Sequence, residues 1–492
     1  MQISRTILVS FLVLSLGISL CAFAQNDPAP AQKDGSVDSG ASQNDAAGQR
    51  PAAPSPAFGQ NAPILNPENP PVSGLDQPSL DMRTSSRSFI SPALVVSESA
   101  DTNSGNVLGK QDVREASEIL GAFDLQKFWA KTDMFAEYVG GGVFYNGGRD
   151  SIRQVQALGF LGVTRWRTGQ ISVRDSFTYL PDGTFGIGAY GAIPGIGLAR
   201  LGGSSGIPAG GLPGTLFFGS PGQGSVGLIP RLSNLVVADM VQSLSPRSAF
   251  TIAGAYSTSH YFQSGDALIN SEQYTGEGGY SYMLGRRDQL GFVYGFQEFH
   301  FPLGTGGKVD ANVINLRYGR TLSGRMSLIL GAGPQHISIF FPGAGTNGRW
   351  SETVTAKLRY KFSSTSLTAS YEKYTTAGSG FYAGANSQVA RLGLMRPLGR
   401  TWVAYGDAGY SYHTRLQPFT GTGATGNHYS EGFVGAALRK QIGREFGVFA
   451  AYHFNDLAFD NGFCGGTPCS RVSNRHIGTV GFDWHPRPVR IE

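Results

Sequence analysis

The chain has 492 residues, of which 40% are apolar and only 15% charged, and it contains 70 glycines, 31 phenylalanines and 20 tyrosines. This composition favours a protein of many strands and turns. The net charge of +5 is mild and the basic residues are scattered, which argues against a nucleic-acid-binding protein.

Residues 1–24 are typical of a secretory signal peptide. Arg5 precedes an apolar run from Ile7 to Leu20, and the segment ends in the small-x-small sequence AFA before Gln25. A lipoprotein signal at Cys21 is the alternative, although a bulky leucine precedes that cysteine. No later stretch has the roughly 18 consecutive apolar residues of a transmembrane helix. We therefore expect an exported chain that crosses no membrane as a helix.

Residues 25–87 are rich in Pro, Ala, Gln, Asn, Ser and Gly and nearly free of aromatic residues. Such a segment cannot bury enough apolar surface to fold alone. We expect a disordered periplasmic tether over 25–87, with a peptidoglycan- or partner-binding segment as the alternative, and one folded domain over 88–492.

A hairpin unit recurs in the folded domain, for example in Tyr282–Phe296, Tyr318–Gly333, Leu394–Gly409 and Leu438–His453. Each unit has two strands of alternating polarity joined by a short turn that contains Gly and Arg. Eight tight turns alternate with nine longer loops. The predicted strands are 89–103, 118–129, 134–146, 154–166, 170–180, 234–244, 249–262, 273–284, 289–301, 310–322, 326–340, 350–362, 366–376, 387–398, 401–415, 428–442, 445–456 and 474–486.

The fold class that follows is all-β, a closed antiparallel transmembrane barrel of about eighteen strands with both ends on the tight-turn, periplasmic side. The first strand pair is the weakest part of this prediction. Asp112–Trp129 also fits an amphipathic helix with Ile119, Leu120 and Phe123 inward, and a helix there would leave sixteen strands.

Each strand has one steadily apolar face. In Thr353–Tyr374, for example, Val354 and Leu358 alternate with Lys357 and Arg359. Aromatic residues concentrate towards the strand ends, as an interfacial girdle requires, whereas the other face mixes Gly, Ser, Thr, Tyr and isolated charges. A soluble sandwich of eighteen such long strands would be unusual. We therefore expect lipid on the apolar face.

This pattern resembles Gram-negative outer-membrane β-barrel porins from about Phe89 to Pro486. The final strand HIGTVGFDW, with Val480, Phe482 and Trp484 on one face, supports the resemblance. It departs from many such barrels because HPRPVRIE follows the aromatic strand, which leaves the closing register open. The resemblance implies an outer-membrane location, contact with lipid and lipopolysaccharide, assembly by the barrel-assembly machinery, and a possible homo-oligomer.

The longest connection, residues 181–233, is rich in glycine and nearly free of charge. A loop of this length in a compact domain is usually functional or disordered. In the porins that the chain resembles, the loop after the fifth strand folds inward and narrows the channel. We expect a constriction here, with a mobile external loop as the alternative.

Twelve charged residues occupy the face assigned to the interior and are the candidate pore-lining set. They are Glu137, Arg174, Asp239, Glu277, Arg317, Lys357, Arg359, Glu372, Arg391, Asp407, Glu431 and Arg439. Charges of both signs suit a water-filled pore for polar solutes. The alternative is that many of them simply pair across the inner surface.

Other chemistry finds little support in the sequence. Cys464 and Cys469 lie in a Gly/Pro turn, where a loop disulfide is favoured over a metal site. No catalytic motif or phosphate loop occurs, so we expect neither an enzyme nor a cofactor.

Two functions fit the barrel. The first is passive diffusion of small polar solutes. The alternative is an export conduit or envelope anchor for exopolysaccharide or another polymer, because Ser91–Gly105 faintly resembles the first strand of outer-membrane proteins of exopolysaccharide systems.

Overall fold

The computed structural model describes most of residues 88–491. The segments 1–87, 104–108, 110–112, 147–151, 181–230, 262–268, 286, 303–306, 324, 342–344, 363–364, 378–381, 417–425, 444, 465–469 and residue 492 lie outside the described residues. The predicted signal peptide, the tether and almost all of the glycine-rich loop fall in these segments. Within the described residues, no helix is both long enough and apolar enough to cross a membrane.

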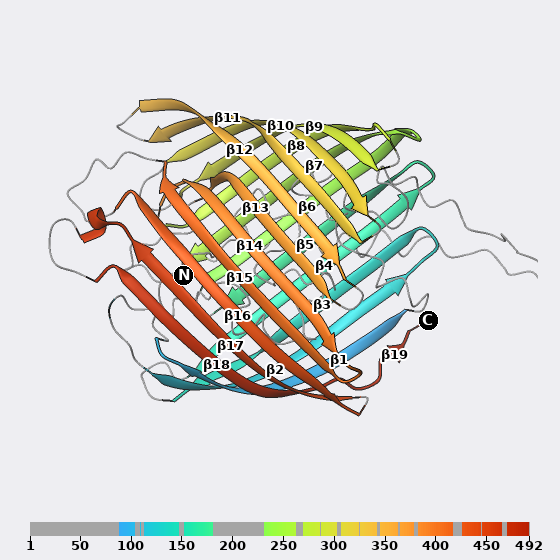
Figure 1. Cartoon of the computed structure of the whole chain (residues 1–492), viewed down its shortest axis with the longest axis vertical. Coiled ribbons are helices and arrows are strands. Elements are labelled where there is room, and N and C mark those ends of the chain that lie inside the picture. The colour runs from blue at the N-terminus through green and yellow to red at the C-terminus, as the bar shows by residue number, and fades with distance from the viewer. Residues whose placement is uncertain are drawn as a thin grey trace, which may run out of the picture. The chain divides into compact units, whose positions relative to one another are not determined.

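Eighteen long strands form one antiparallel sheet that closes on itself, because β1 pairs with β18 as well as with β2 (Figure 1). The first nine are β1 (Phe89–Asp101), β2 (Arg114–Phe128), β3 (Thr132–Tyr145), β4 (Ile152–Trp166), β5 (Gly169–Leu180), β6 (Arg231–Ser245), β7 (Ser248–Tyr261), β8 (Ser271–Met283) and β9 (Asp288–His300). The others are β10 (Lys308–Ser323), β11 (Met326–Phe341), β12 (Gly345–Lys361), β13 (Ser366–Thr376), β14 (Ala385–Leu398), β15 (Trp402–Arg415), β16 (His428–Ile442), β17 (Phe446–Phe459) and β18 (Val472–Trp484).

The predicted closed antiparallel barrel of eighteen strands is confirmed. The helical alternative for Asp112–Trp129 is wrong, because β2 pairs along its length with both β1 and β3. One loop boundary also needs correction: residues 231–233, which were assigned to the glycine-rich loop, begin β6 and pair with both β5 and β7. The short 3-10 helix η3 (Asn461–Cys464) was not predicted.

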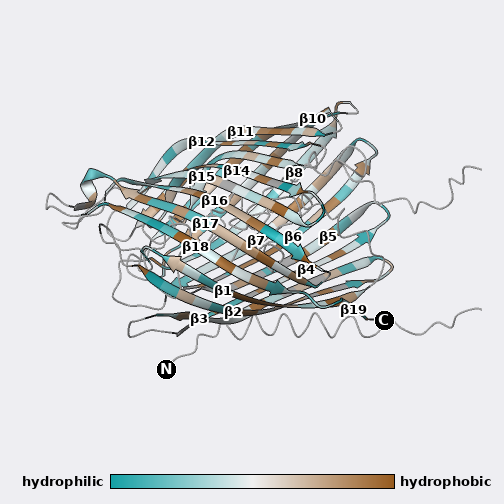
Figure 2. Cartoon of the chain, turned by 60° about the horizontal axis from the view of Figure 1, so that its bottom comes forward, coloured by the Kyte–Doolittle hydropathy of each residue, from teal (hydrophilic) through white to brown (hydrophobic). Residues whose placement is uncertain are grey.

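The outer face of the barrel carries the exposed large apolar residues, and Figure 2 shows how hydrophobic and hydrophilic residues alternate along the strands. In β9, Phe292 and Tyr294 are about half exposed, whereas Val293 between them is 3% exposed. Alternation of this kind places every second side chain on the concave face, where neighbours cover it. The large apolar residues that are exposed therefore belong to the convex surface.

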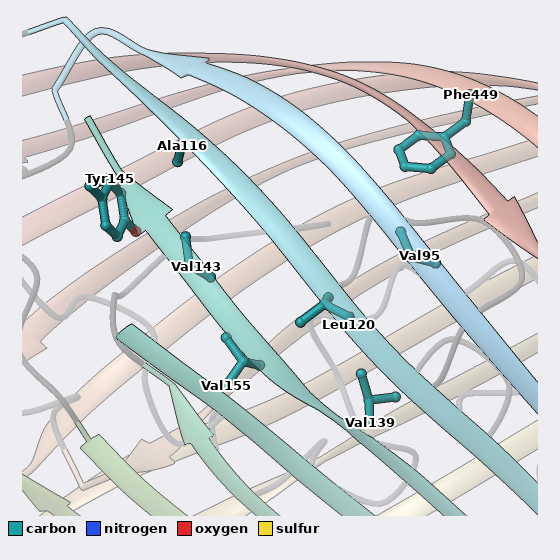
Figure 3. Packing of buried hydrophobic residues seen from close by; sticks show 8 residues of the cluster. All are labelled: Val95, Ala116, Leu120, Val139, Val143, Tyr145, Val155 and Phe449. Atoms are coloured by element: carbon teal, nitrogen blue, oxygen red, sulfur yellow. The ribbon is translucent and has the colours of Figure 1, made fainter. Parts of the chain in front are cut away.

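The concave face is less polar than the sequence predicted. Val95 of β1, Leu120 of β2 and Val143 of β3 are fully buried and form one apolar cluster there. Phe449 of β17 joins this cluster from the other side of the β1–β18 seam (Figure 3). Apolar side chains therefore pack along the inside of the barrel where the first and last strands meet.

The seam between β1 and β18 joins the first and last long strands of the folded domain. Val95 lies opposite Asp483 and Asp101 opposite Ile477. The C-terminal residues that seemed to disturb the closing register extend the seam instead, because β19 (Val489–Arg490) pairs with the first two residues of β1.

A buried ion pair fastens the loop end of this seam. The Arg475 guanidinium on β18 donates from Nε to the Asp101 carboxylate on β1 at 2.9 and 3.1 Å, and from Nη2 at 2.5 Å. The two side chains are only 3% and 5% exposed. The backbone N–H of Asn103 also donates to Asp101, at 2.9 Å. The strand pairing and the charges thus specify the same register.

We expect Arg475→Met to lower the free energy of unfolding by about 3–5 kcal/mol, because Asp101 would remain charged and buried without its partner. Urea unfolding of the barrel in detergent micelles would measure the change. Arg487→Met is the matched control, since it removes a well-exposed pairing with Glu445 (3.6 Å) at the turn end of the barrel, which we expect to cost less than about 1 kcal/mol. Equal effects of the two substitutions would contradict the seam assignment.

Candidate channel interior

The candidate pore-lining residues all lie on strands. Asp239, Glu277, Arg317, Glu372 and Glu431 are 2–8% exposed. Lys357, Arg359, Arg391 and Arg439 are partly buried, whereas the side chains of Glu137, Arg174 and Asp407 lie outside the described residues. The first five share the concave face with apolar neighbours. Their role in lining a pore stays a prediction.

A first charged group spans β6, β8 and β10. Asp239 lies opposite Ala253, and Ala253 lies opposite Glu277, so the two carboxylates share one row across three strands. Asp239 also accepts a hydrogen bond from the Ser172 hydroxyl. Arg317 and Asp239 both lie within electrostatic range of Glu277. The group therefore contains two acids and one base.

A second charged group spans β13 to β16. Register places Glu372 opposite Val389, Val389 opposite Ser411, and Ser411 opposite Glu431. The Ser411 hydroxyl donates to the Glu431 carboxylate at 3.2 Å. Glu372, Glu431 and Arg391 of β14 all lie within electrostatic range of the buried Tyr374 hydroxyl. Here too the acids outnumber the base by one.

A third contact at the turn end joins Arg439 of β16 to Asp483 of β18. The guanidinium donates from Nε to Oδ1 at 3.0 Å and from Nη2 to Oδ2 at 2.5 Å. The intervening strand β17 contributes Gly447, where a Cβ would lie 2.6 Å from Asp483 Oδ1 and 2.7 Å from Arg439 Nη2. The ion pair crosses β17 because this position has no side chain. Asp483 was missed from the sequence, and only its polarity in an apolar strand marked it.

At the loop end, the described part of the connection between β13 and β14, residues 377 and 382–384, packs against the inside of the barrel. A Cβ on Gly384 would lie 3.3 Å from Val309 Cγ2 of β10 and 3.1 Å from Leu416 Cδ1. Three strands separate β10 from β14 in the sheet, so this contact crosses the interior. Sequence reasoning expected an inward connection only at 181–233, nearly all of which lies outside the described residues.

Aromatic residues pack beneath this connection. Tyr429 of β16 is fully buried and stacks on His413, with ring centroids 4.5 Å apart. Tyr382 packs against the same tyrosine at 5.4 Å. Burial raises the pKa of the Tyr382 hydroxyl, and the nearby Asp460 carboxylate raises it further. Packed apolar and aromatic groups therefore occupy part of the interior at the loop end.

The chain matches no protein-family model and no curated protein. Among solved structures it is similar to the outer membrane protein OpdK from Pseudomonas aeruginosa, with 11% identity and a TM-score of 0.38 over 82% of this chain and 99% of that chain. It is also similar to a BenF-like porin from Pseudomonas fluorescens Pf-5, with 9% identity and a TM-score of 0.39 over 82% and 99% of the two chains. These likenesses are distant. The assignment of a barrel fold rests on the strand pairing of this chain itself.

We expect Gly447→Val to destabilise the barrel by a few kcal/mol, because a side chain there displaces Arg439 from the buried Asp483. The thermal midpoint in detergent would report the loss. Gly478→Val is the matched control, since a Cβ at this β18 position meets nothing within 4 Å. A Gly447→Val protein as stable as this control would show that the ion pair tolerates a side chain between its partners.

Proposed function

We propose that the chain is an outer-membrane channel through which small polar solutes diffuse passively. The observation that carries the proposal is a closed antiparallel barrel of eighteen strands with apolar residues outside and charged residues inside. Barrels of about 16–18 strands are wide enough for an aqueous channel, whereas about eight strands leave room only for side chains or one small ligand.

The outer surface supports a position in a bilayer. The strands have 11–17 residues. A tilted β-strand needs about 9–11 residues to cross the hydrocarbon core of a bilayer, so every strand is long enough. Large apolar side chains such as Phe292, Leu316 and Val434 are about half exposed on this surface. In water they would form an unusually large apolar patch, whereas in lipid they are solvated.

The tight-turn ends of the strands fit one boundary of a membrane. Trp402 and Trp484 are exposed on the outer face near the tight turns, where an interfacial aromatic girdle is expected. The Lys440 ammonium lies over the Trp402 ring at 5.2 Å, an arrangement that suits the level of the lipid headgroups. We assign the side with the tight turns, where β1 begins and β18 ends, to the periplasm.

Several further features belong to the proposal and rest on the sequence. They are the cleaved signal peptide of residues 1–24, the periplasmic tether of residues 25–87, assembly by the barrel-assembly machinery, contact with lipopolysaccharide, and a possible homo-oligomer. The Cys464–Cys469 disulfide belongs here too, because Cys469 lies outside the described residues.

Single-channel recording in planar lipid bilayers tests the channel. We expect stepwise conductance from the purified protein. The double substitution Lys357→Gln and Arg359→Gln should shift the reversal potential in a KCl gradient towards cation selectivity, because it removes two positive charges from the interior. Lys440→Gln, near the exposed Trp402 at the turn end, is the control and should shift it little. A folded barrel without conductance would contradict the channel and favour a polymer conduit or an anchor. An unshifted potential would mean that the two charges are screened or face elsewhere.

Deleting residues 186–227 tests the predicted constriction by the glycine-rich loop. If the loop narrows the channel, the deletion variant should conduct more current and admit larger solutes, which liposome swelling with sugars of increasing size would measure. Barrel stability should be unchanged, because strand pairing between β5 and β6 is retained. Unchanged conductance in a folded variant would favour an external loop instead.

A further inference from the structure

A small recess in the inner surface lies over β8, β9 and β10. Its lining consists of Thr275, Glu277, Val293, Gly295, Gln297, Val313 and Asn315. The register explains the set, because Glu277, Gly295 and Val313 lie opposite one another in one row across the three strands. The rows on either side supply Gln297 and Asn315. The recess is thus built by adjacent strands of the barrel and requires no loop.

The missing side chain of Gly295 makes the recess. A Cβ at this position would meet only the carbonyl oxygen of Gly276, at 3.9 Å. The carboxylate and amide groups around it therefore have open space in front of them. A larger side chain at Gly295 would fill this space without forcing the backbone of the neighbouring strands to move.

Two buried side-chain oxygens of the recess have no donor in the described part of the chain. Glu277 and Gln297 are 8% and 2% exposed, yet Glu277 Oε1 and Gln297 Oε1 accept no hydrogen bond there. Asn315 Oδ1 is not a third such group, because it reaches across Gly333 of β11 and accepts from the Thr353 hydroxyl of β12 at 2.6 Å. Buried oxygens left without donors are costly, so the recess is suited to a guest that brings donors.

The charge around the recess fixes the kind of donor. Glu277 lies within electrostatic range of one base, Arg317, and one further acid, Asp239. With both acids ionised, these three groups sum to one negative charge, and the burial of Glu277 makes that charge costly unless a cation accompanies it. A primary ammonium group carries one positive charge and three N–H donors, so it can both compensate the charge and donate to the two unpaired oxygens. A neutral hydroxyl leaves the charge uncompensated, and a carboxylate is repelled.

We propose that this recess is a binding subsite for the primary ammonium group of a small solute, with Glu277 and Gln297 as the acceptors. The recess receives the charged head of the solute while the rest stays in the channel interior. The inference rests on the proposed channel function for the route of the solute. The binding itself requires only the folded barrel.

Butylammonium, 1-butanol and butyrate form a matched probe series, because they share one carbon chain and differ in the head group. Titration calorimetry on the detergent-solubilised barrel measures their binding. Block of single-channel current measures their access to the recess. We expect butylammonium to bind and to reduce the current at lower concentration than the other two. Equal behaviour of butylammonium and 1-butanol, or stronger binding of butyrate, would overturn the proposal.

Glu277→Gln should weaken butylammonium binding about tenfold or more, because it keeps the shape and removes the charge. Glu118→Gln removes another buried carboxylate from the distant strand β2 and should change the affinity less than twofold. Unchanged affinity in Glu277→Gln would refute the subsite. Gln297→Leu provides the same test through a neutral acceptor if Glu277→Gln fails to assemble, with weaker binding expected and unchanged binding contradicting the proposal.

Gly295→Val should abolish butylammonium binding by filling the recess. Gly276→Val is the matched control, because Gly276 lies on the neighbouring strand β8 and a Cβ there meets nothing within 4 Å. Butylammonium binding that survives Gly295→Val would show that the amine binds elsewhere. The calorimetric readout separates the two proposals. A barrel that binds butylammonium without conducting ions contradicts the channel alone, whereas one that conducts without binding it contradicts the subsite alone.

Discussion

The closure of one antiparallel sheet is the constraint on which the rest of this structure depends. A backbone N–H or C=O that faces lipid without a partner costs several kcal/mol, so a sheet in a bilayer tolerates no free edge. The first and last strands must therefore pair, although almost the whole folded domain lies between them in sequence. Here β1 pairs with β18 and then with β19, and the buried contact between Asp101 and Arg475 ties the loop end of the same seam.

Closure also decides which interactions the interior contains. Every second residue of a strand faces inward, and neighbouring strands bring inward residues into rows. A charged residue in such a row can reach a partner two strands away only if the strand between them offers a small side chain. Gly447, which lies between Arg439 and Asp483, is such a position. A glycine on the inner face thus lets two long side chains meet across the strand that separates them.

The same geometry produces the ammonium recess. Gly295 leaves a gap that Glu277 and Gln297 border without being able to fill, and their oxygens stay unpaired within the described chain. Where a glycine lies between two charged partners, an ion pair forms across it. Where two buried oxygens without donors border the glycine, as at Gly295, the gap is suited to a donor from outside. Glycines on the inner face therefore serve both the stability of the barrel, at Gly447, and the proposed recognition of a solute, at Gly295.

Local pattern by itself determined the alternation of faces and the tight turns, because period-two polarity and Gly-containing turns are properties of short segments; it predicted about eighteen strands with sixteen as the alternative. It failed to separate strand from helix at β2, where Ile119, Leu120 and Phe123 fit either period, and pairing with β1 and β3 settled that choice. Only the tertiary structure decided which charges meet, how the seam extends through β19, and that Gly384 reaches Val309 across the interior. These contacts join residues that are distant in sequence, and no periodicity within one strand encodes them.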